Sequence, residues 1–217
     1  MKHLTQNFLT ENDRQKVRAA VKDAEKHTSG QIVPMIVSAS YHYPMADVTG
    51  AAAMSFLIAV FLTDYVCHLM WMDAHDMWVF IVLFTVLFAV FHAVIHRFVP
   101  LKRLFLSKRE INEEVRENAI ASFYREGLHR TRHETGILIF ISILERKVWI
   151  LADRGIHEKV DESTWKEIVT LIRNGILEKR QADALCDAIK KIGQILETHF
   201  PAHKGDTDEL TDLIVEE

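Results

Sequence analysis

Met77-WVFIVLFTVLFAVFHAVI-His96 is a run of residues without a formal charge. Twenty residues in an α-helix span about 30 Å, the thickness of the hydrocarbon core of a bilayer. A second run precedes it, because Val48 to Thr63 is uncharged and the apolar pattern resumes after Asp64 up to Met72. The rest of this 217-residue chain is too small to bury both runs in a soluble core. The sequence therefore predicts a two-helix transmembrane hairpin over residues 46–99, with the lipid bilayer as its partner.

The residues that flank the hairpin predict its orientation. Five basic residues follow the second run: Arg97, Lys102, Arg103, Lys108 and Arg109. The short link between the runs has Asp73 and Asp76 and no Lys or Arg. Basic flanks stay on the cytoplasmic side, so we expect the inner (cytoplasmic) membrane with both termini in the cytoplasm. The first thirty residues contain no apolar leader, and the two cysteines lack a CxxC spacing, which fits a reducing compartment.

The residues outside the hairpin predict one α/β domain. Helices are expected at 10–27, 107–127, 165–174 and 181–199, and buried strands at 31–40, 136–144 and 147–152. The strands are apolar on both faces, so helices should cover both sides of the sheet. We divide the chain into a first soluble segment (1–45), the hairpin (46–99), a second soluble segment (100–203) and an acidic mobile tail (204–217). Pro34 predicts that its strand either lies at an edge or pairs mainly after Pro34.

Three stretches resemble one known family. They are FLTENDRQKVRAAVKDAEKHTSGQIVPMIVSAS (8–40), TGILIFISILERKVWILADRGIHEKVDESTW (135–165) and ILETHFP (195–201). In this order they resemble the TPM domain family, in the bacterial branch where a transmembrane hairpin follows the first strand. The resemblance implies a three-layer α/β/α fold with a mixed sheet. Some members of the family bind calcium or other divalent ions, and some have been described as acid phosphatases. Bacterial relatives are often encoded beside LemA-type membrane proteins.

The sequence departs from soluble members of that family in two places. The loop after the first strand usually offers carboxylates, but here it reads SYHYPMADV and retains only Asp47. The usual Gly-Tyr-Gly-Leu-Glu turn reads Asp153-Arg-Gly-Ile-His157. Both departures weigh against metal binding and against phosphatase activity.

An acidic cluster follows the third predicted strand and is the candidate metal site. It consists of Asp153, Glu158, Asp161 and Glu162. Several carboxylates at a strand end can hold a hard cation such as Ca²⁺ or Mg²⁺. The alternative is a solvated loop whose acidic residues favour the start of the helix before Trp165. No cofactor is required by any other motif.

Histidines and one carboxylate near the hairpin offer weaker candidates. His92 and His96 share a helix face and either bind zinc or haem or lie at the cytoplasmic interface beside Arg97. Asp64 is a carboxylate inside the membrane-spanning run, which snorkels or is buried in an oligomer. His129, His133 and Glu134 do not form an HExxH motif, because Ile137 stands where the second His would be.

Small residues recur every four positions in both runs. The first stripe is Ala51, Ser55, Ala59 and Thr63, and the second is Thr85, Ala89 and Ala93. In lipid, close approach of backbones along small residues supplies helix–helix attraction, either within the hairpin or between protomers. The alternative is a chance recurrence in an alanine-rich span.

These patterns favour a non-enzymatic interaction and assembly module over an enzyme. The partner is expected to be a second copy of the chain or another membrane protein such as a LemA-type protein. With a net charge of −4, the chain is not expected to have nucleic acid as a partner. The alternative function is a divalent-metal-dependent acid phosphatase that uses the Asp153 cluster.

Overall fold

The protein was analysed as a computed structural model that describes residues 3–40, 43–71, 77–98, 101, 105–131, 134–202 and 210–216. The chain divides into two compact units. The sheet unit comprises Met1–Tyr41 and Asn112–Glu217, and the hairpin unit comprises His42–Ile111. The hairpin unit is thus inserted in the sequence directly after the first strand, and it extends further at both ends than the predicted 46–99.

The sheet unit contains a mixed four-stranded sheet in the order β3-β2-β1-β4. Its strands are β1 (Gln31–Val37), β2 (Gly136–Ser142), β3 (Lys147–Ala152) and β4 (Ile214–Glu216). β1 pairs in parallel with β2 and β4, whereas β2 and β3 form an antiparallel hairpin. The three longer strands confirm the predicted strands.

Pro34 lies in a strand with neighbours on both sides, so the edge alternative is wrong, whereas the pairing with β4 begins after Pro34, as the second alternative predicts. The Gln31 N–H donates to the Thr135 carbonyl on the β2 side, at 3.1 Å. Successive residues of a strand direct their N–H groups to opposite edges, so Ile32 and Pro34 face β4. There the Ile32 N–H donates to the Glu25 carboxylate at 2.8 Å, and β4 pairs only from Met35 onward. No ladder bond therefore requires an N–H at Pro34.

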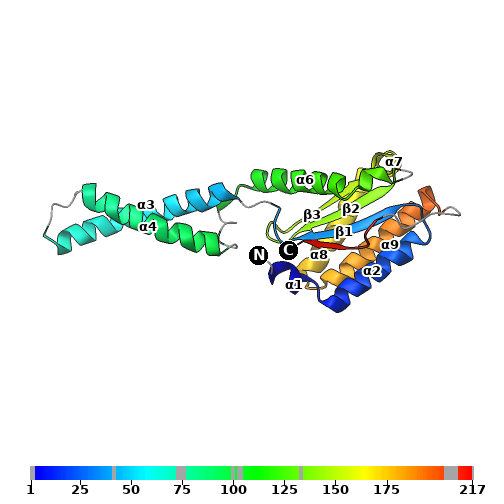
Figure 1. Ribbon diagram of the computed structural model, residues 1–217, viewed down its shortest axis with the longest axis horizontal. Helices are drawn as coiled ribbons and strands as arrows, with labels where there is room; N and C mark the ends of the chain where they lie inside the picture. Colours follow the sequence, from blue (N-terminus) through cyan, green and yellow to red (C-terminus); the bar gives the residue numbers. More distant parts are fainter. Residues whose placement is uncertain are drawn as a thin grey trace. The chain divides into compact units, whose positions relative to one another are not determined.

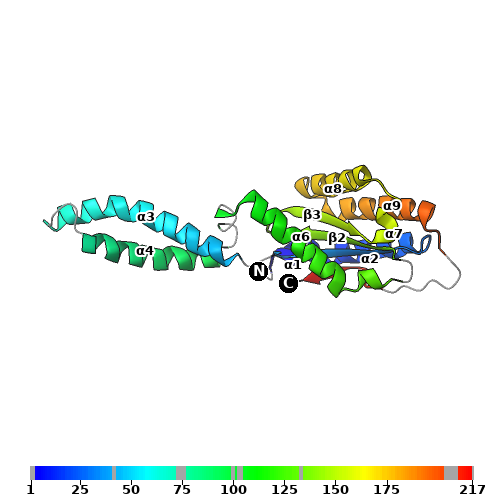
Figure 2. The ribbon, with the colours of Figure 1, turned by 90° about the horizontal axis from the view of Figure 1, so that it is seen from above.

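Helices cover both faces of this sheet, as predicted (Figures 1 and 2). One face carries α2 (Glu11–Glu25), α8 (Glu162–Leu177) and α9 (Gln181–His199), and the opposite face carries α6 (Lys108–Arg125). Alternate strand residues such as Ile32, Ile137 and Ile139 pack in the core beneath α2, α8 and α9. The sheet unit is therefore a three-layer α/β/α sandwich.

Local signals in the sequence explain where two of these helices begin or end. Thr10 and Asp13 form a capping box of α2, because each side chain binds the backbone N–H of the other. α6 buries one face, and Gly127 follows it with a φ of 77° that a glycine adopts without strain. The buried face is Ile111, Val115, Ala119 and Phe123.

The hairpin unit consists of two long helices that lie side by side, α3 (Pro44–Leu69) and α4 (Met77–Arg97). Pro44 occupies the first turn of α3, where its missing N–H leaves no helical bond unmade. Both helices are long and apolar enough to cross a membrane. Trp71 is exposed at one end of the pair of helices, and Trp78 lies in the first turn of α4 at the same end.

Three segments differ from the sequence prediction. The predicted mobile tail (204–217) instead contributes Ile214–Glu216 to the sheet as β4, because Leu213 and Val215 are apolar and pack against the core. The predicted turn Asp153–Gly155 opens a short helix, α7 (Arg154–His157). A further short helix, α1 (His3–Phe8), precedes the first predicted one, and a 3₁₀ turn follows α6 (Leu128–Arg130).

Candidate functional site

Asp153, the first member of the predicted metal cluster, caps α7. Its Oδ1 accepts the backbone N–H of Arg154 at 2.7 Å. Its Oδ2 is buried without a hydrogen-bond partner. Glu158 lies one turn further on and pairs with the Arg154 guanidinium at 3.0 Å. The two carboxylates thus flank the short helix α7, with Asp153 as its N-cap residue and Glu158 as its C-cap residue.

The other two members belong to the start of α8. Asp161 is its N-cap residue, and Glu162 in the first turn pairs with Lys166 at 3.1 Å. Among the described residues, the structure places no group of three or more His, Cys, Asp or Glu side chains where they could hold a metal ion. The side chains present do not fit the divalent cation that the family resemblance implies, so we derive no metal-dependent step.

A polar cluster that the sequence did not reveal lies at the carboxyl ends of β1 and β2, and we call it the Glu145 cluster. It consists of Ser40, Asn118, Ser142 and Glu145. Glu145 is only 1% exposed, yet its carboxylate accepts the Ser40 N–H at 3.0 Å and the Ser142 hydroxyl. Asn118 on α6 donates to the Ser40 carbonyl at 2.8 Å. Both backbone groups of Ser40 are therefore held, just before the chain leaves the sheet for α3.

The local sequence explains why Glu145 occupies this place. It lies in the four-residue turn between β2 and β3, where Arg146 adopts a φ of 54°. In the sequence, Glu145-Arg146 lies between two predicted strands and reads only as a turn, since acidic residues are ordinary in turns. The usable signal was a carboxylate at the edge where parallel strands end, which is where α/β sheets collect polar groups.

The hairpin unit uses one of the two predicted small-residue stripes. On α3, Ser55 and Ala59 are fully buried, and the buried set continues beyond the prediction to Cys67. The members of this α3 stripe are Ala51, Ser55, Ala59, Thr63 and Cys67. Ser55 and Thr63 donate their hydroxyls to carbonyls one turn earlier, so no polar group is left unsatisfied.

The α4 stripe does not contact α3. Thr85, Ala89 and Ala93 are all exposed, so a contact within the hairpin that uses both stripes is wrong. Half-buried rings occupy the inner face instead, at successive centroid distances of 5.9–6.2 Å, namely Phe80, Phe84, Phe88 and His92. The large rings of α4 fill the space beside the small residues of the α3 stripe. Small residues on both helices would leave that space empty at the same helix separation.

The base of the hairpin contains a hydrogen-bonded histidine–aspartate pair. The Nδ1 of His96 lies 3.1 Å from the Oδ2 of Asp47 in the first turns of α3. The Asp47 side chain is 6% exposed, whereas that of His96 is 73% exposed. In the sequence, His92 and His96 are candidates for a zinc or haem site or for the cytoplasmic interface, and Asp64 is a separate carboxylate that snorkels or is buried in an oligomer. Asp64 is exposed on α3, and the partner of His96 comes instead from the same end of the antiparallel helix.

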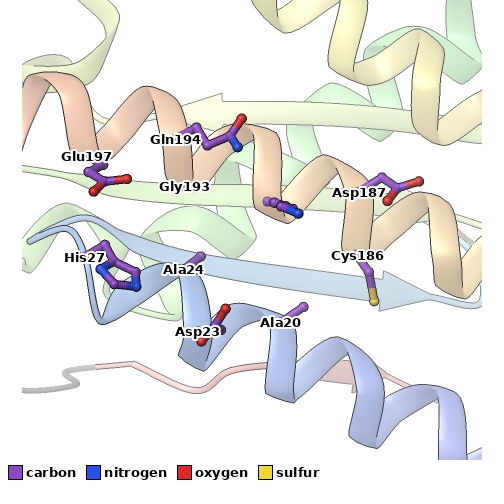
Figure 3. Close-up of a pocket in the computed structure, with 10 residues that line it drawn as sticks. Ala20, Asp23, Ala24, His27, Cys186, Asp187, Gly193, Gln194 and Glu197 are labelled. Atoms are coloured by element: carbon purple, nitrogen blue, oxygen red, sulfur yellow. The ribbon is translucent and has the colours of Figure 1, made fainter.

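A shallow groove of about 360 Å³ runs between α2 and α9 (Figure 3). Gly193 forms part of its floor, because a Cβ at that position would lie 2.8 Å from the Ala24 Cβ. Cys186 lines the groove, and burial together with the nearby Asp183 and Asp187 carboxylates raises the pKa of its thiol. A raised pKa disfavours the nucleophilic thiolate, so the groove offers a surface and not a reactive centre.

The histidines near the second strand do not form a catalytic group in the described residues. His129 lies in the 3₁₀ turn and packs on Tyr124, at 5.0 Å between ring centroids. Glu134 is exposed, and His133 lies outside the described residues. This agrees with the absence of an HExxH motif.

The geometry defines a class of protein, a three-layer α/β domain interrupted by a pair of long apolar helices. A family model described as the TPM domain matches residues 98–195. The fold is similar to the NMR structure of the BA42 protein from the psychrophilic bacterium Bizionia argentinensis sp. nov. The TM-score is 0.59 and the identity 20%, over 96% of each chain. No match was found among curated proteins. Residues 98–195 thus match a TPM domain, and the solved structure shows the same fold.

Proposed function

We propose that this chain is a membrane-anchored TPM module that assembles a protein complex in the bacterial cytoplasmic membrane. The partner is a second copy of the chain or another membrane protein, such as a LemA-type protein. The hairpin crosses the bilayer with both termini in the cytoplasm, in accord with the basic residues that follow α4. Nucleic acid is not a partner, since the chain carries a net charge of −4.

The observation that carries this proposal is the unequal use of the two small-residue stripes. The α3 stripe is buried inside the hairpin, whereas Thr85, Ala89 and Ala93 form a narrow stripe on the exposed side of α4. In lipid there is little hydrophobic drive between helices, and small residues allow the close backbone approach that replaces it. The outer face of α4 is therefore suited to a partner helix.

The described part of the sheet unit favours binding over catalysis. Its buried carboxylate, Glu145, accepts hydrogen bonds that hold the backbone of Ser40. Its half-buried thiol, Cys186, has a raised pKa. Neither group is arranged as a nucleophile beside a general base, the arrangement that covalent catalysis uses.

Pull-down from membranes in a mild detergent tests the assembly. The tagged full chain should retain its partner, and Ala89→Leu should reduce the retained amount severalfold because the larger side chain separates the two backbones. The matched control is Ala53→Leu, which makes the same change on an exposed position of α3. Equal retention by the two variants would contradict a role for the α4 stripe.

Two further measurements separate this proposal from its alternatives. Reporter fusions at Asp73 and at Glu217 should report opposite sides of the membrane, and an external carboxyl terminus would contradict the orientation. For the metal-dependent phosphatase, millimolar Ca²⁺ or Mg²⁺ should raise the melting temperature, and replacing Asp153 and Glu158 with Ala should abolish that rise. We expect neither a metal-dependent rise nor phosphatase activity.

A further inference from the structure

β4 is held to the sheet by a much shorter ladder than the other strands. It pairs with β1 over three positions, Met35–Ile214, Ile36–Val215 and Val37–Glu216. The β1–β2 ladder spans seven pairs and the β2–β3 ladder six. Pro34 cannot extend the β4 ladder, because it has no N–H to offer at that edge. A three-residue strand lies at the lower limit of strand length in folded proteins.

Side chains around β4 fasten it at a small number of points. Leu213 is 3% exposed and belongs to the main core, where Val215 also packs. Two ion pairs flank the strand, Lys22 with Asp212 at 3.4 Å and Arg125 with Glu216. The Lys22 and Arg125 side chains are half or more exposed, and ion pairs of this kind contribute little.

A surface pocket lies beside β4. It has a volume of about 180 Å³ and is lined by Val33 of β1, Glu126, and three residues of the C-terminal segment. Those three residues are Leu210, Thr211 and Ile214. Side chains that border an open pocket make fewer packing contacts than side chains surrounded on all sides. β4 is thus the strand of this sheet that can leave with the smallest loss of contacts.

The place that β4 occupies has a definite chemistry. It accepts an apolar strand parallel to β1, with a leucine before the strand to enter the core and a carboxylate at its end to meet Arg125. Figure 1 shows β4 beside β1 at the outer edge of the sheet. This β1 edge is unpaired once its own β4 has left, and an unpaired edge recruits another strand of matching pattern. The segment Leu213–Glu216 of a second copy satisfies every one of these requirements.

We propose that two copies of this chain exchange their β4 strands, so that each β1 edge binds the Leu213–Glu216 segment of the other copy. The inference rests on the proposed assembly in the membrane, which confines the copies and raises their effective concentration. Exchange keeps every contact of β4 and only changes which copy supplies it. The surface that pairs the copies is then the β1 edge with Arg125 and Lys22.

A charge exchange between differently tagged full-length copies tests this proposal. One copy carries Arg125→Glu and the other carries Glu216→Arg, so two like charges face each other when each copy binds its own β4. When the two variants exchange their strands, an acidic and a basic residue face each other at both edges. Co-purification of the mixed variants should therefore exceed that of either variant with itself severalfold. Equal co-purification in all three combinations would overturn strand exchange, even if assembly through α4 persists.

Disulfide trapping provides the second measurement, in a background with Cys67→Ala and Cys186→Ala. Ile36 and Val215 are register partners, so Cys at both positions of every copy should form a disulfide that reports a folded sheet, between two copies if the strands are exchanged and within one copy if they are not. Ile36→Cys in one copy and Val215→Cys in the other should give about tenfold more covalent dimer than the control pair. The control is Ile36→Cys with Ile141→Cys, register partners on strands that do not exchange. Dimer no higher than this control would overturn the proposal.

Discussion

Replacing Glu145 with Ala should destabilise the sheet unit by about 3–4 kcal/mol, because hydrogen bonds to a charged acceptor contribute roughly 1.5–3 kcal/mol each. Two such bonds end on this carboxylate, from the Ser40 N–H and from the Ser142 hydroxyl. The Ser142 hydroxyl can rotate toward another acceptor, so its loss is partial. The Ser40 N–H is part of the backbone and loses its partner outright.

The expected change in melting temperature follows from the size of the unit. For a unit of roughly 150 residues, 1 kcal/mol corresponds to about 2–4 °C, so Glu145→Ala should lower the midpoint by about 6–16 °C. Glu145→Gln retains one acceptor oxygen for the Ser40 N–H and should cost about 1 kcal/mol. Glu117→Ala, on the exposed side of α6, is the matched control and should stay within about 0.5 kcal/mol.

Thermal unfolding of the full chain in detergent micelles measures these differences. Trp71 and Trp78 belong to the hairpin and are replaced with Phe, so that Trp149 and Trp165 report the sheet unit alone. The reasoning would be refuted if Glu145→Ala and Glu117→Ala lowered the midpoint equally. It would also be refuted if Glu145→Gln were as damaging as Glu145→Ala, since the retained acceptor would then be irrelevant.

Three further predictions concern the hairpin, the groove and the first long helix. Cysteines introduced at Phe56 and Phe80, whose rings lie 6.1 Å apart, should form a disulfide, whereas cysteines introduced at Ala59 and Ala89 should not. Ala59→Leu should destabilise the packing of α3 on α4 by about 1–3 kcal/mol, because Ala59 is fully buried. Cys186 should be alkylated slowly at neutral pH and faster as the pH rises toward its raised pKa, and Asp187→Asn should accelerate the reaction; mass spectrometry follows both. Thr10→Ala should destabilise α2 by about 1 kcal/mol at neutral pH. Because the Thr10 hydroxyl lowers the pKa of Asp13, this contribution is present above the unfolded-state pKa and is lost as the pH falls through the folded one; a melting series in acid measures the loss.

The sequence alone predicted the features that depend on neighbouring residues. The absence of charge over about twenty residues predicts each long helix of the hairpin, and the spacing of Val115 and Ala119 predicts the buried face of α6. The Thr10 capping box and the Gly127 helix end are likewise local, since each depends on dihedral angles and bonds within one turn. The TPM resemblance added the layer order that periodicity cannot supply.

The tertiary structure decided which distant segments meet. Glu145 holds Ser40 across 105 positions of sequence, and Arg125 meets Glu216 across 91. A spacing of four residues identified two small-residue stripes but not which of them α3 and α4 would bury, because that choice depends on how large rings fill the space between helices. The acidic tail likewise contained Leu213 and Val215, whose burial against the core outweighs the charges around them. Pairing of this kind is a property of three-dimensional distances, and no local pattern in the chain encodes those distances.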